Sequence, residues 1–458
     1  MKATTAILSA ACLGYSMVIL DTTVLNVALP SIAAETGAIP AQQQWIVDSY
    51  VLVMTALLLA GGGLIDRFGA AKVFRAGVVL FTVASVLCAM TNVASVLIAA
   101  RVLQGVGGAM LIPATLTVVM MSFPEVLERG RAIAIIATVA ASPQAFGPSL
   151  GGILVDTLGW RSIFLLNVPI GIATLLFARR LPVGQGNKRP LDITGVVLIV
   201  IALGGLTYGI IEYANSQAGV NVIGSLAVAV LAGVAFIMVE KRTSTPLLPG
   251  PILNARGLHL YVLAGLFMFV LFYAALFAAN LYFQKVLGLS ALDSGLLLLP
   301  AGVPVFALPI MVSKLAGKKW SPVALTTTGT VIATTGAAMG LLSGVSQSPF
   351  VVSASLLVLG IGFGIASPPH LALATSVAPQ GTGGVTSALA NAGRQAGYLF
   401  GVALVGMAGQ STFGYQQAVW IAIAGGVLAL VVLVVAATYS RSRSAEGISI
   451  EPLTTKAG

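Results

Sequence analysis

Residues 94–119 read ASVLIAARVLQGVGGAMLIPATLTVV, a 26-residue run whose one charged side chain is Arg101. An α-helix that crosses a bilayer needs about 20 consecutive, mostly apolar residues, so this run is long enough to span. The composition of the whole chain agrees, because 58% of its 458 residues are hydrophobic and 8% are charged, against about 25% charged in soluble domains. A water-soluble fold is therefore excluded.

Apolar runs of similar length recur along the chain. We predict an all-α integral membrane protein with fourteen transmembrane helices near residues 6–29, 43–63, 73–91, 94–119, 131–155, 160–178, 191–211, 219–239, 258–283, 292–313, 320–343, 349–372, 383–406 and 417–438. Fourteen helices of about 22 residues leave about 150 residues for loops and tails. These short loops have no room for a nucleotide-binding or receptor domain.

The basic residues predict the orientation, since cytoplasmic loops carry an excess of Lys and Arg. With the N-terminus in the cytoplasm, 19 of the 23 Lys and Arg residues fall on the cytoplasmic side. The outer side holds Arg161 and Lys285, while Arg101 and Arg394 lie within spans. We therefore predict that both termini are cytoplasmic, and we attribute the net charge of +10 to topology rather than to nucleic-acid binding.

Two polar segments, 179–190 and 240–259, bracket two of the predicted helices and suggest a duplicated architecture. The predicted division is a six-helix bundle (1–180), a two-helix insert with its flanking loops (181–245), a second six-helix bundle (246–440) and a disordered cytoplasmic tail (441–458).

Charged side chains inside a bilayer are costly and mark functional sites by default. Asp21 and Arg101 are predicted at matching depth, about 12 Å and 10 Å from the outer ends of their helices at 1.5 Å per residue. Protonation of an aspartate that faces an arginine would weaken the pair and couple proton binding to helix rearrangement. The alternative is a static pair that fixes helix packing.

Asp48 and Arg394 are the other charges within spans. Asp48 needs a partner or water to stay charged, so an unpaired Asp48 suits a proton carrier; the alternative is a hydrated residue near the interface. Arg394 either attracts an anionic group or holds a helix contact. With Asn26, Gln104 and Glu212, Arg394 forms the set of possible substrate-cavity residues, although an interfacial position is the simpler interpretation of Glu212.

Helix 131–155 contains Pro143, Gly147, Pro148, Gly151 and Gly152. Gly147 and Gly151 share a face and allow close approach of another backbone, and the prolines free carbonyl groups and permit bending. We predict a contact at the interface of two moving halves, with ordinary small-residue packing as the alternative.

The turn after the second predicted helix concentrates charge on the cytoplasmic side. It could latch helix ends by ion pairs that break when the ends separate, or it could be a solvated loop. The residues assigned to this gating loop are Gly62, Asp66, Arg67, Gly69, Lys72 and Arg75.

Motifs for other chemistry are missing from the sequence. There is no phosphate-binding GxxxxGK[ST] motif, and glycine runs inside apolar helices do not make a dinucleotide site. Cys12 and Cys88 lack metal-ligand spacing, and His259 and His370 form no cluster. We predict no metal, no cofactor and no enzymatic activity, which leaves an ion gradient as the energy source.

Together these motifs resemble the major facilitator superfamily, specifically its fourteen-helix drug:proton antiporter branch, which includes exporters such as the methylenomycin exporter. The loop 62–75 is similar to the signature GxLaDrxGrkxxl, residues 97–109 to lxxxRxxqGxgaA, and residues 147–152 to the end of the antiporter signature gxxxGPxxGG. Residues 20–30 resemble the helix-1 signature of the branch, and residues 160–171 also look like it.

The resemblance implies two six-helix bundles that give alternating access to a central cavity and export a substrate in exchange for protons. The family's helix-4 arginine, implicated in proton coupling, and its neighbouring helix-1 acid correspond to Arg101 and Asp21. Ala70 and Ala71 replace an expected basic pair, and Pro143 replaces the first glycine of the antiporter signature. These departures could weaken the latch and alter the bending of the helix.

The predicted function is a bacterial inner-membrane antiporter that exports an amphipathic drug or antibiotic for protons, without an obligatory protein partner. A symporter or facilitator of a small metabolite is the alternative within transport. A channel or a sensor is the alternative of another class.

Overall fold

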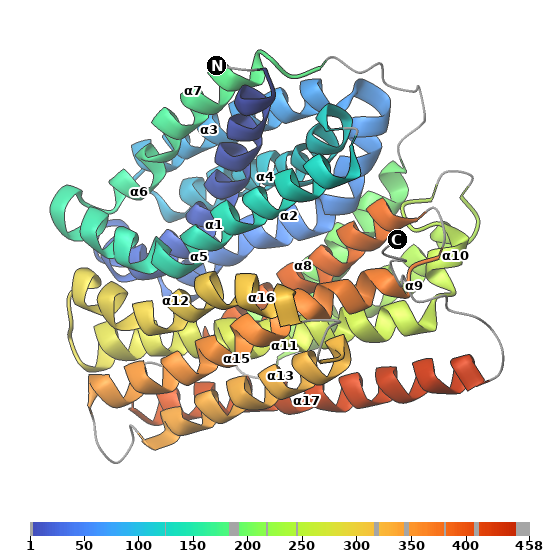
Figure 1. The fold of residues 1–458 in the computed structure, drawn as a ribbon. Coiled ribbons are helices and arrows are strands. Elements are labelled where there is room, and N and C mark those ends of the chain that lie inside the picture. Colours follow the sequence, from blue (N-terminus) through green and yellow to red (C-terminus); the bar gives the residue numbers. More distant parts are fainter. Residues whose placement is uncertain are drawn as a thin grey trace.

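The computed structural model shows a bundle of long, roughly aligned helices (Figure 1). It describes residues 3–123, 125–182, 192–216, 219–243, 246–315, 320–342, 348–379, 382–406 and 412–445. The predicted disordered tail begins at residue 441, but the last helix continues to Ala445; the rest of the predicted tail lies outside the described residues.

The first half of the bundle, called the N-terminal half, comprises α1 (Ala3–Thr36), α2 (Pro40–Phe68), α3 (Ala70–Met90), α4 (Ala94–Ser122), α5 (Val126–Leu158), α6 (Arg161–Leu165) and α7 (Asn167–Ala178). The insert comprises α8 (Ile193–Ser216) and α9 (Val220–Glu240). The C-terminal half follows the short α10 (Gly250–Leu253) and comprises α11 (Arg256–Leu281), α12 (Ala291–Leu315), α13 (Pro322–Met339), α15 (Pro349–Ser376), α16 (Gly383–Gly406) and α17 (Thr412–Ala445). A π-helical turn, Tyr282–Val286, extends α11, and a 3₁₀ turn, Gly340–Leu342, follows α13.

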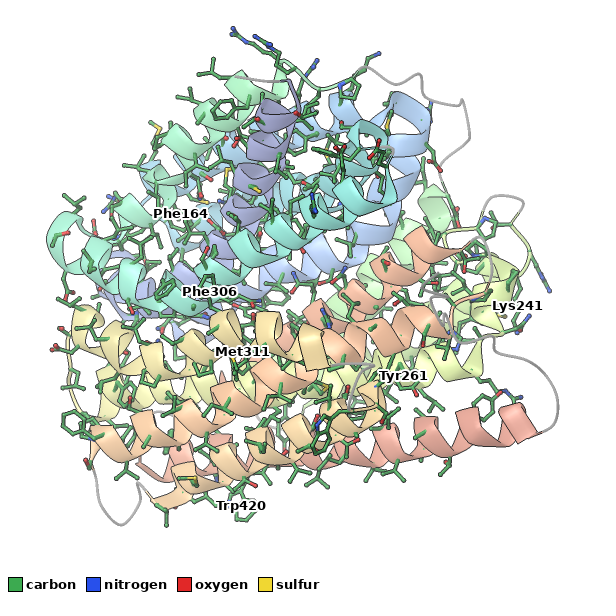
Figure 2. All side chains as sticks on the ribbon, viewed as in Figure 1. Phe164, Lys241, Tyr261, Phe306, Met311 and Trp420 are labelled. Carbon is green, nitrogen blue, oxygen red and sulfur yellow. The ribbon has the colours of Figure 1, made fainter. Side chains whose placement is uncertain are left out.

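The two halves lie against each other along a seam formed mainly by α2, α5, α12 and α16. The N-terminal half is at the top of Figure 1 and the C-terminal half at the bottom. α5 packs along α12 and α2 along α16, while α8 of the insert contacts both α2 and α16. Phe306 of α12 lies at this boundary in Figure 2, with its ring centroid 5.8 Å from that of Phe146 of α5.

The ends of the bundle differ in charge. Basic side chains gather at one end, called the basic face, on which Lys241 is labelled in Figure 2. The basic face carries Arg67, Lys72, Arg179, Arg180, Lys241, Arg242 and Arg256. At the other end, called the opposite face, glycines with positive φ make three of the turns: Gly37 (67°), Gly159 (79°) and Gly288 (65°). Only a glycine adopts these backbone angles without strain.

Each predicted apolar run overlaps a helix, and run 160–178 is divided into α6 and α7. Among the described residues, eleven helical segments are long and apolar enough to cross a membrane, or twelve if α2, bent by 56° between Pro40–Leu58 and Ala60–Phe68, is one span. α5 and α16 are not among them. Both lie at the seam, where small and polar residues replace the apolar side chains that a lipid-facing helix requires. The count of fourteen spans and the domain boundaries at 180, 245 and 440 stay predictions.

Large apolar side chains cover the outer surface of the helices. Met90 on α3, Val220 on α9 and Trp420 on α17 are 77%, 86% and 59% exposed, and Trp420 projects from the edge of the bundle in Figure 2. Exposed apolar surface on this scale is rare in soluble proteins and requires an apolar environment.

Candidate functional site

The two charges expected to face each other in the N-terminal half are in contact. Asp21 lies at the middle of α1, Arg101 lies on α4, and both are almost fully buried. Arg101 Nη1 donates a hydrogen bond to Asp21 Oδ2 within an ion pair. The contact joins α1 to α4 inside the bundle, and Arg101 Nη2 has no hydrogen-bond partner among the described residues.

Neutral side chains from α3, α4 and α7 complete the surroundings of the carboxylate. Gln104 Nε2 and Asn167 Nδ2 each donate to Asp21 Oδ1 at 3.0 Å. The same two amides approach Ser85 Oγ at 2.7 Å and 3.3 Å, and Gln104 Oε1 accepts from Arg101 Nη1 at 2.7 Å. Gln104 was grouped with the possible cavity residues, but the structure places it in this network, fully buried.

The arginine also reaches α2. Arg101 Nε donates to the Ile46 carbonyl oxygen at 3.1 Å, and the guanidinium carbon lies 4.2 Å from the Tyr50 ring centroid. Tyr50 in turn donates to the Val18 carbonyl oxygen of α1 at 3.1 Å. Five of the helices in the N-terminal half, α1, α2, α3, α4 and α7, therefore meet at one ion pair.

Asp48, the second intramembrane acid, has very different surroundings. It lies on α2, fully buried, and neither carboxyl oxygen has a hydrogen-bond partner among the described residues. One turn nearer the opposite face, Gln44 Nε2 crosses the seam to the Ala403 carbonyl oxygen of α16 at 3.1 Å. Tyr398 of α16 is close enough to Asp48 to interact electrostatically. Asp48 is therefore beside the seam and apart from the Asp21 network.

The glycines of α5 correct the seam hypothesis in part. A Cβ on Gly147 would overlap the Thr23 side chain, and one on Gly151 would lie 2.9 Å from the Val24 carbonyl oxygen, so both glycines face α1 of their own half. Gly152 instead faces α12, where a Cβ would overlap the Ala291 carbonyl oxygen. Residues four apart share one face of a helix, and α1 occupies the face that Gly147 and Gly151 share.

The two prolines of α5 have different surroundings. Pro143 has no N–H, which leaves the Val139 carbonyl oxygen without its helical donor. Ser142 Oγ donates to that oxygen at 2.6 Å, and Ser16 Oγ of α1 lies 3.5 Å from it. The Pro143 carbonyl oxygen accepts from Thr23 Oγ1 at 3.0 Å. Pro148 lies where α5 meets α12, because its carbonyl oxygen would be 2.5 Å from a Cβ on Gly295.

The proposed latch at the basic face is not closed by ion pairs in this structure. Asp66, Arg67 and Lys72 are exposed, and the ion pairs among the described residues are Asp21–Arg101 and Glu35–Arg161. Gly69 makes the turn with φ of 85°, and Gly62 borders open space. Arg75 Nε donates to the Ala178 carbonyl oxygen at the end of α7, 3.0 Å away.

Hydrogen bonds between the halves form a seal toward the opposite face. Among the described residues, those with nitrogen or oxygen acceptors are Tyr398 to Thr22 O, Asn26 to Tyr398, Asn280 to Asn26 O, Gln284 to Val27 O, Gln44 to Ala403 O, Ser149 to Gly295 O, Leu292 N to Asp156 and Gln144 to Tyr273. Each joins residues at mid-span or nearer the opposite face. Asn26, a predicted cavity residue, is thus part of the seal.

Arg394 lies at mid-span on α16, just to the basic side of the seal. Its Nη2 donates to the Ser367 carbonyl oxygen at 2.8 Å, and its guanidinium carbon is 5.4 Å from the Phe269 ring centroid. Tyr15 of α1 is within electrostatic range across the seam. Glu212 lies near the opposite-face end of α8, in the insert.

Sequence reasoning did not assign Ser85, Tyr50 or Asn167. Asn167 is an amide within an apolar run, which is a usable signal because buried amides need partners. Serine and tyrosine are too common in membrane spans to stand out. No three His, Cys, Asp or Glu side chains in the described part of the chain are placed to hold a metal ion, so the structure assigns no metal site.

Comparison with known proteins identifies the family. A family model described as Major Facilitator Superfamily matches residues 11–402. The chain belongs to the major facilitator superfamily. This member is 33% identical over 410 residues to the methylenomycin A resistance protein of Streptomyces coelicolor, covering 88% of this chain and 85% of the relative. It is 36% identical over 430 residues to the cephamycin export protein CmcT of Amycolatopsis lactamdurans, covering 90% and 86%.

The fold of this major facilitator is shared with solved structures of much lower sequence similarity. The crystal structure of a POT family transporter in complex with a thioalcohol-conjugated peptide superposes with a TM-score of 0.70 at 13% identity. The superposition covers 96% of this chain and 99% of that one. The family match and the relatives, rather than these structures, show that the chain is a multi-pass membrane transporter and not an enzyme.

The Asp21–Arg101 network predicts that single and double substitutions of the ion pair affect stability unequally. Asp21→Asn should lower thermal stability in detergent micelles, because removing one partner of a buried ion pair leaves an uncompensated charge at a cost of about 3–5 kcal/mol. Asp21→Asn with Arg101→Gln should be more stable than Asp21→Asn alone. Melting curves of the parent, both single variants and the double variant measure the coupling. Additive losses would show that the two residues do not act as a pair.

Proposed function

We propose that the chain is a proton-coupled antiporter that exports amphipathic drugs or antibiotics by alternating access between its two halves. The observation that carries the proposal is the buried Asp21–Arg101 network, which ties five helices of one half to a group that can exchange a proton. The similarity of the chain to a methylenomycin A resistance protein and a cephamycin export protein supports drugs or antibiotics as the transported compounds.

The membrane of a bacterial cell, the inner membrane where there are two, is the proposed location. The exposed apolar side chains of α3, α9 and α17 would face lipid. The basic face and both termini would be cytoplasmic, since cytoplasmic loops are rich in Lys and Arg. The opposite face, with its seal, would then point outward, so that the structure represents a state closed to the outside.

Proton exchange at Asp21 would act through the ion pair. A proton on the carboxyl group removes the charge that Arg101 faces, and the network of α1, α2, α3, α4 and α7 then loses its central contact. The ligand of this step is the proton itself, and no cofactor is required because the gradient supplies the energy. The Asp21 network would favour different arrangements of the N-terminal half in its protonated and ionised states.

Asp48 would be a second proton carrier. A buried carboxylate without hydrogen bonds is costly, so Asp48 would be protonated while the seal is closed. Opening of the outward side would hydrate Asp48 and allow it to ionise. Protons bound from outside would thus favour closure of the seal.

Drug susceptibility tests the proposed function. Expression of the parent chain in a bacterial host without its own efflux pumps should raise the inhibitory concentration of at least one compound in a panel that includes methylenomycin A and a cephamycin. Asp21→Asn should abolish the protection, and a protonophore should abolish it in the parent. Asp293→Asn is the matched control, because Asp293 is exposed at the start of α12.

Two results would contradict the proposal. One is full protection by Asp21→Asn at equal expression. The other is protection by the parent that a protonophore does not reduce.

The closure of the seal should depend on pH through Asp48. Spin labels at Leu158 of α5 and Lys285 after α11, in a chain with Cys12 and Cys88 replaced by serine, report the separation of the halves at the opposite face. Raising the pH should increase the population of long distances, since the closed state holds the neutral carboxyl group. Asp48→Asn should remove this response without preventing closure. A response that persists unchanged in Asp48→Asn would assign it to another group.

A further inference from the structure

The C-terminal half contains one intramembrane cation without a matching acid. Between residues 256 and 440 the sequence has a single acidic residue, Asp293, and Asp293 lies at the opposite-face end of α12, where its carboxylate bonds Ser290. Arg394 is not in an ion pair with any described residue. Its Nε also lacks a hydrogen-bond partner among the described residues, although its Nη2 is bonded to the Ser367 carbonyl oxygen.

The acids of the N-terminal half do not compensate Arg394. Asp21 is engaged by Arg101, Gln104 and Asn167. Asp48 has no hydrogen-bonded or ion-paired partner. His370 on α15, whose Nε2 is 2.7 Å from the Tyr261 carbonyl oxygen, adds no negative charge in either protonation state. The centre of the molecule therefore carries an uncompensated positive charge at Arg394.

The position of Arg394 is suited to a ligand. The side chain of Arg394 is half-buried, and so are those of Tyr15 on α1 and Gln144 on α5. All three lie near mid-span at the seam between the halves. Gln144 Nε2 donates to Tyr273 across the seam at 3.3 Å, and the Tyr273 and Tyr398 rings pack edge to face with centroids 4.4 Å apart. These aromatic contacts separate Arg394 from the opposite face. Arg394 thus lies between the seal and the basic face.

The groups around Arg394 define the chemistry they can accept. A guanidinium with an unpaired Nε–H and the Phe269 ring beside it suits a carboxylate or a similar anion attached to an apolar or aromatic body. A cationic drug would instead require an acid, and the described part of the C-terminal half offers none near Arg394. We propose that Arg394 is the substrate-binding residue that selects amphipathic organic anions. This inference rests on the proposed export function, whose substrate class it specifies.

The proton and substrate sites are then separate. The proton would be exchanged at carboxyl groups of the N-terminal half, and the anion would bind a cation of the C-terminal half, so that the two ligands do not compete for one group. Their coupling would act through the arrangement of the halves. Exchange of one exported monoanion for one imported proton moves two elementary charges in the same electrical direction.

Equilibrium binding to the purified chain tests the assignment with three probes of matched size: 2-naphthoate, neutral 2-naphthamide and cationic 2-naphthylmethylammonium. Isothermal titration calorimetry in detergent should show that 2-naphthoate binds at least about tenfold more tightly than the other two probes. One charge-assisted hydrogen bond is enough to give a difference of this size. Arg394→Gln should remove this preference and leave 2-naphthamide affinity unchanged. Arg394→Lys should keep most of the preference.

The controls separate a binding role from a folding role. Arg256→Gln, an exposed arginine at the start of α11, should retain the preference. The melting temperature and the size-exclusion profile show whether Arg394→Gln is folded. If Arg394→Gln is not folded, Arg394→Met, which keeps the apolar stem of the side chain, is used in its place. No binding of 2-naphthoate to the parent, equal binding of the three probes, or a preference that survives both Arg394→Gln and Arg394→Met would overturn the assignment. Because binding needs no gradient, it can fail while drug export persists, and export can fail while binding persists.

Discussion

The ion pair between Asp21 and Arg101 constrains how the N-terminal half can be built. An arginine inside a bilayer must be paired or hydrated, and here α1 supplies the carboxylate, α2 a carbonyl oxygen and an aromatic ring, and α4 the guanidinium itself. Asn167 of α7 donates both to the Asp21 carboxylate and to Ser85 Oγ of α3. A change in the charge of the Asp21 carboxyl group therefore alters contacts among five helices at once. A proton-driven rearrangement requires this property.

The charges divide unequally between the halves, and this division shapes the energetics of transport. The N-terminal half holds the two buried acids and Arg101, whereas the C-terminal half holds Arg394. If the cargo is a monoanion, one exchange for a proton moves two charges and gains about 4.6 kcal/mol per 100 mV of membrane potential, twice the value for one charge. A neutral cargo would gain half of that. The sign of the substrate charge thus determines how strongly the membrane potential drives export.

Much of the fold could be predicted from the sequence because the bilayer imposes simple rules. Long apolar runs predicted the helices, and equal depth along α1 and α4 predicted that Asp21 would face Arg101. Depth says nothing about neighbours, so Gln104 was assigned to a cavity although its amide bonds Asp21 and Ser85. Likewise, the spacing of Gly147 and Gly151 fixed a shared face of α5, but only the packed structure shows that α1 occupies it. The surroundings of Asp48 depend on α16, more than 300 residues away, and no local pattern encodes that contact.

The proposed coupling of proton exchange at Asp21 to substrate movement can be tested by comparing two assays in the same proteoliposomes. The first assay measures accumulation of an exported compound under an imposed pH gradient, and the second measures its counterflow exchange without a gradient. Asp21→Asn should lose accumulation but retain counterflow, because the variant still rearranges but no longer exchanges a proton at this site. Proton-driven accumulation by Asp21→Asn at the level of the parent would contradict the proposed coupling.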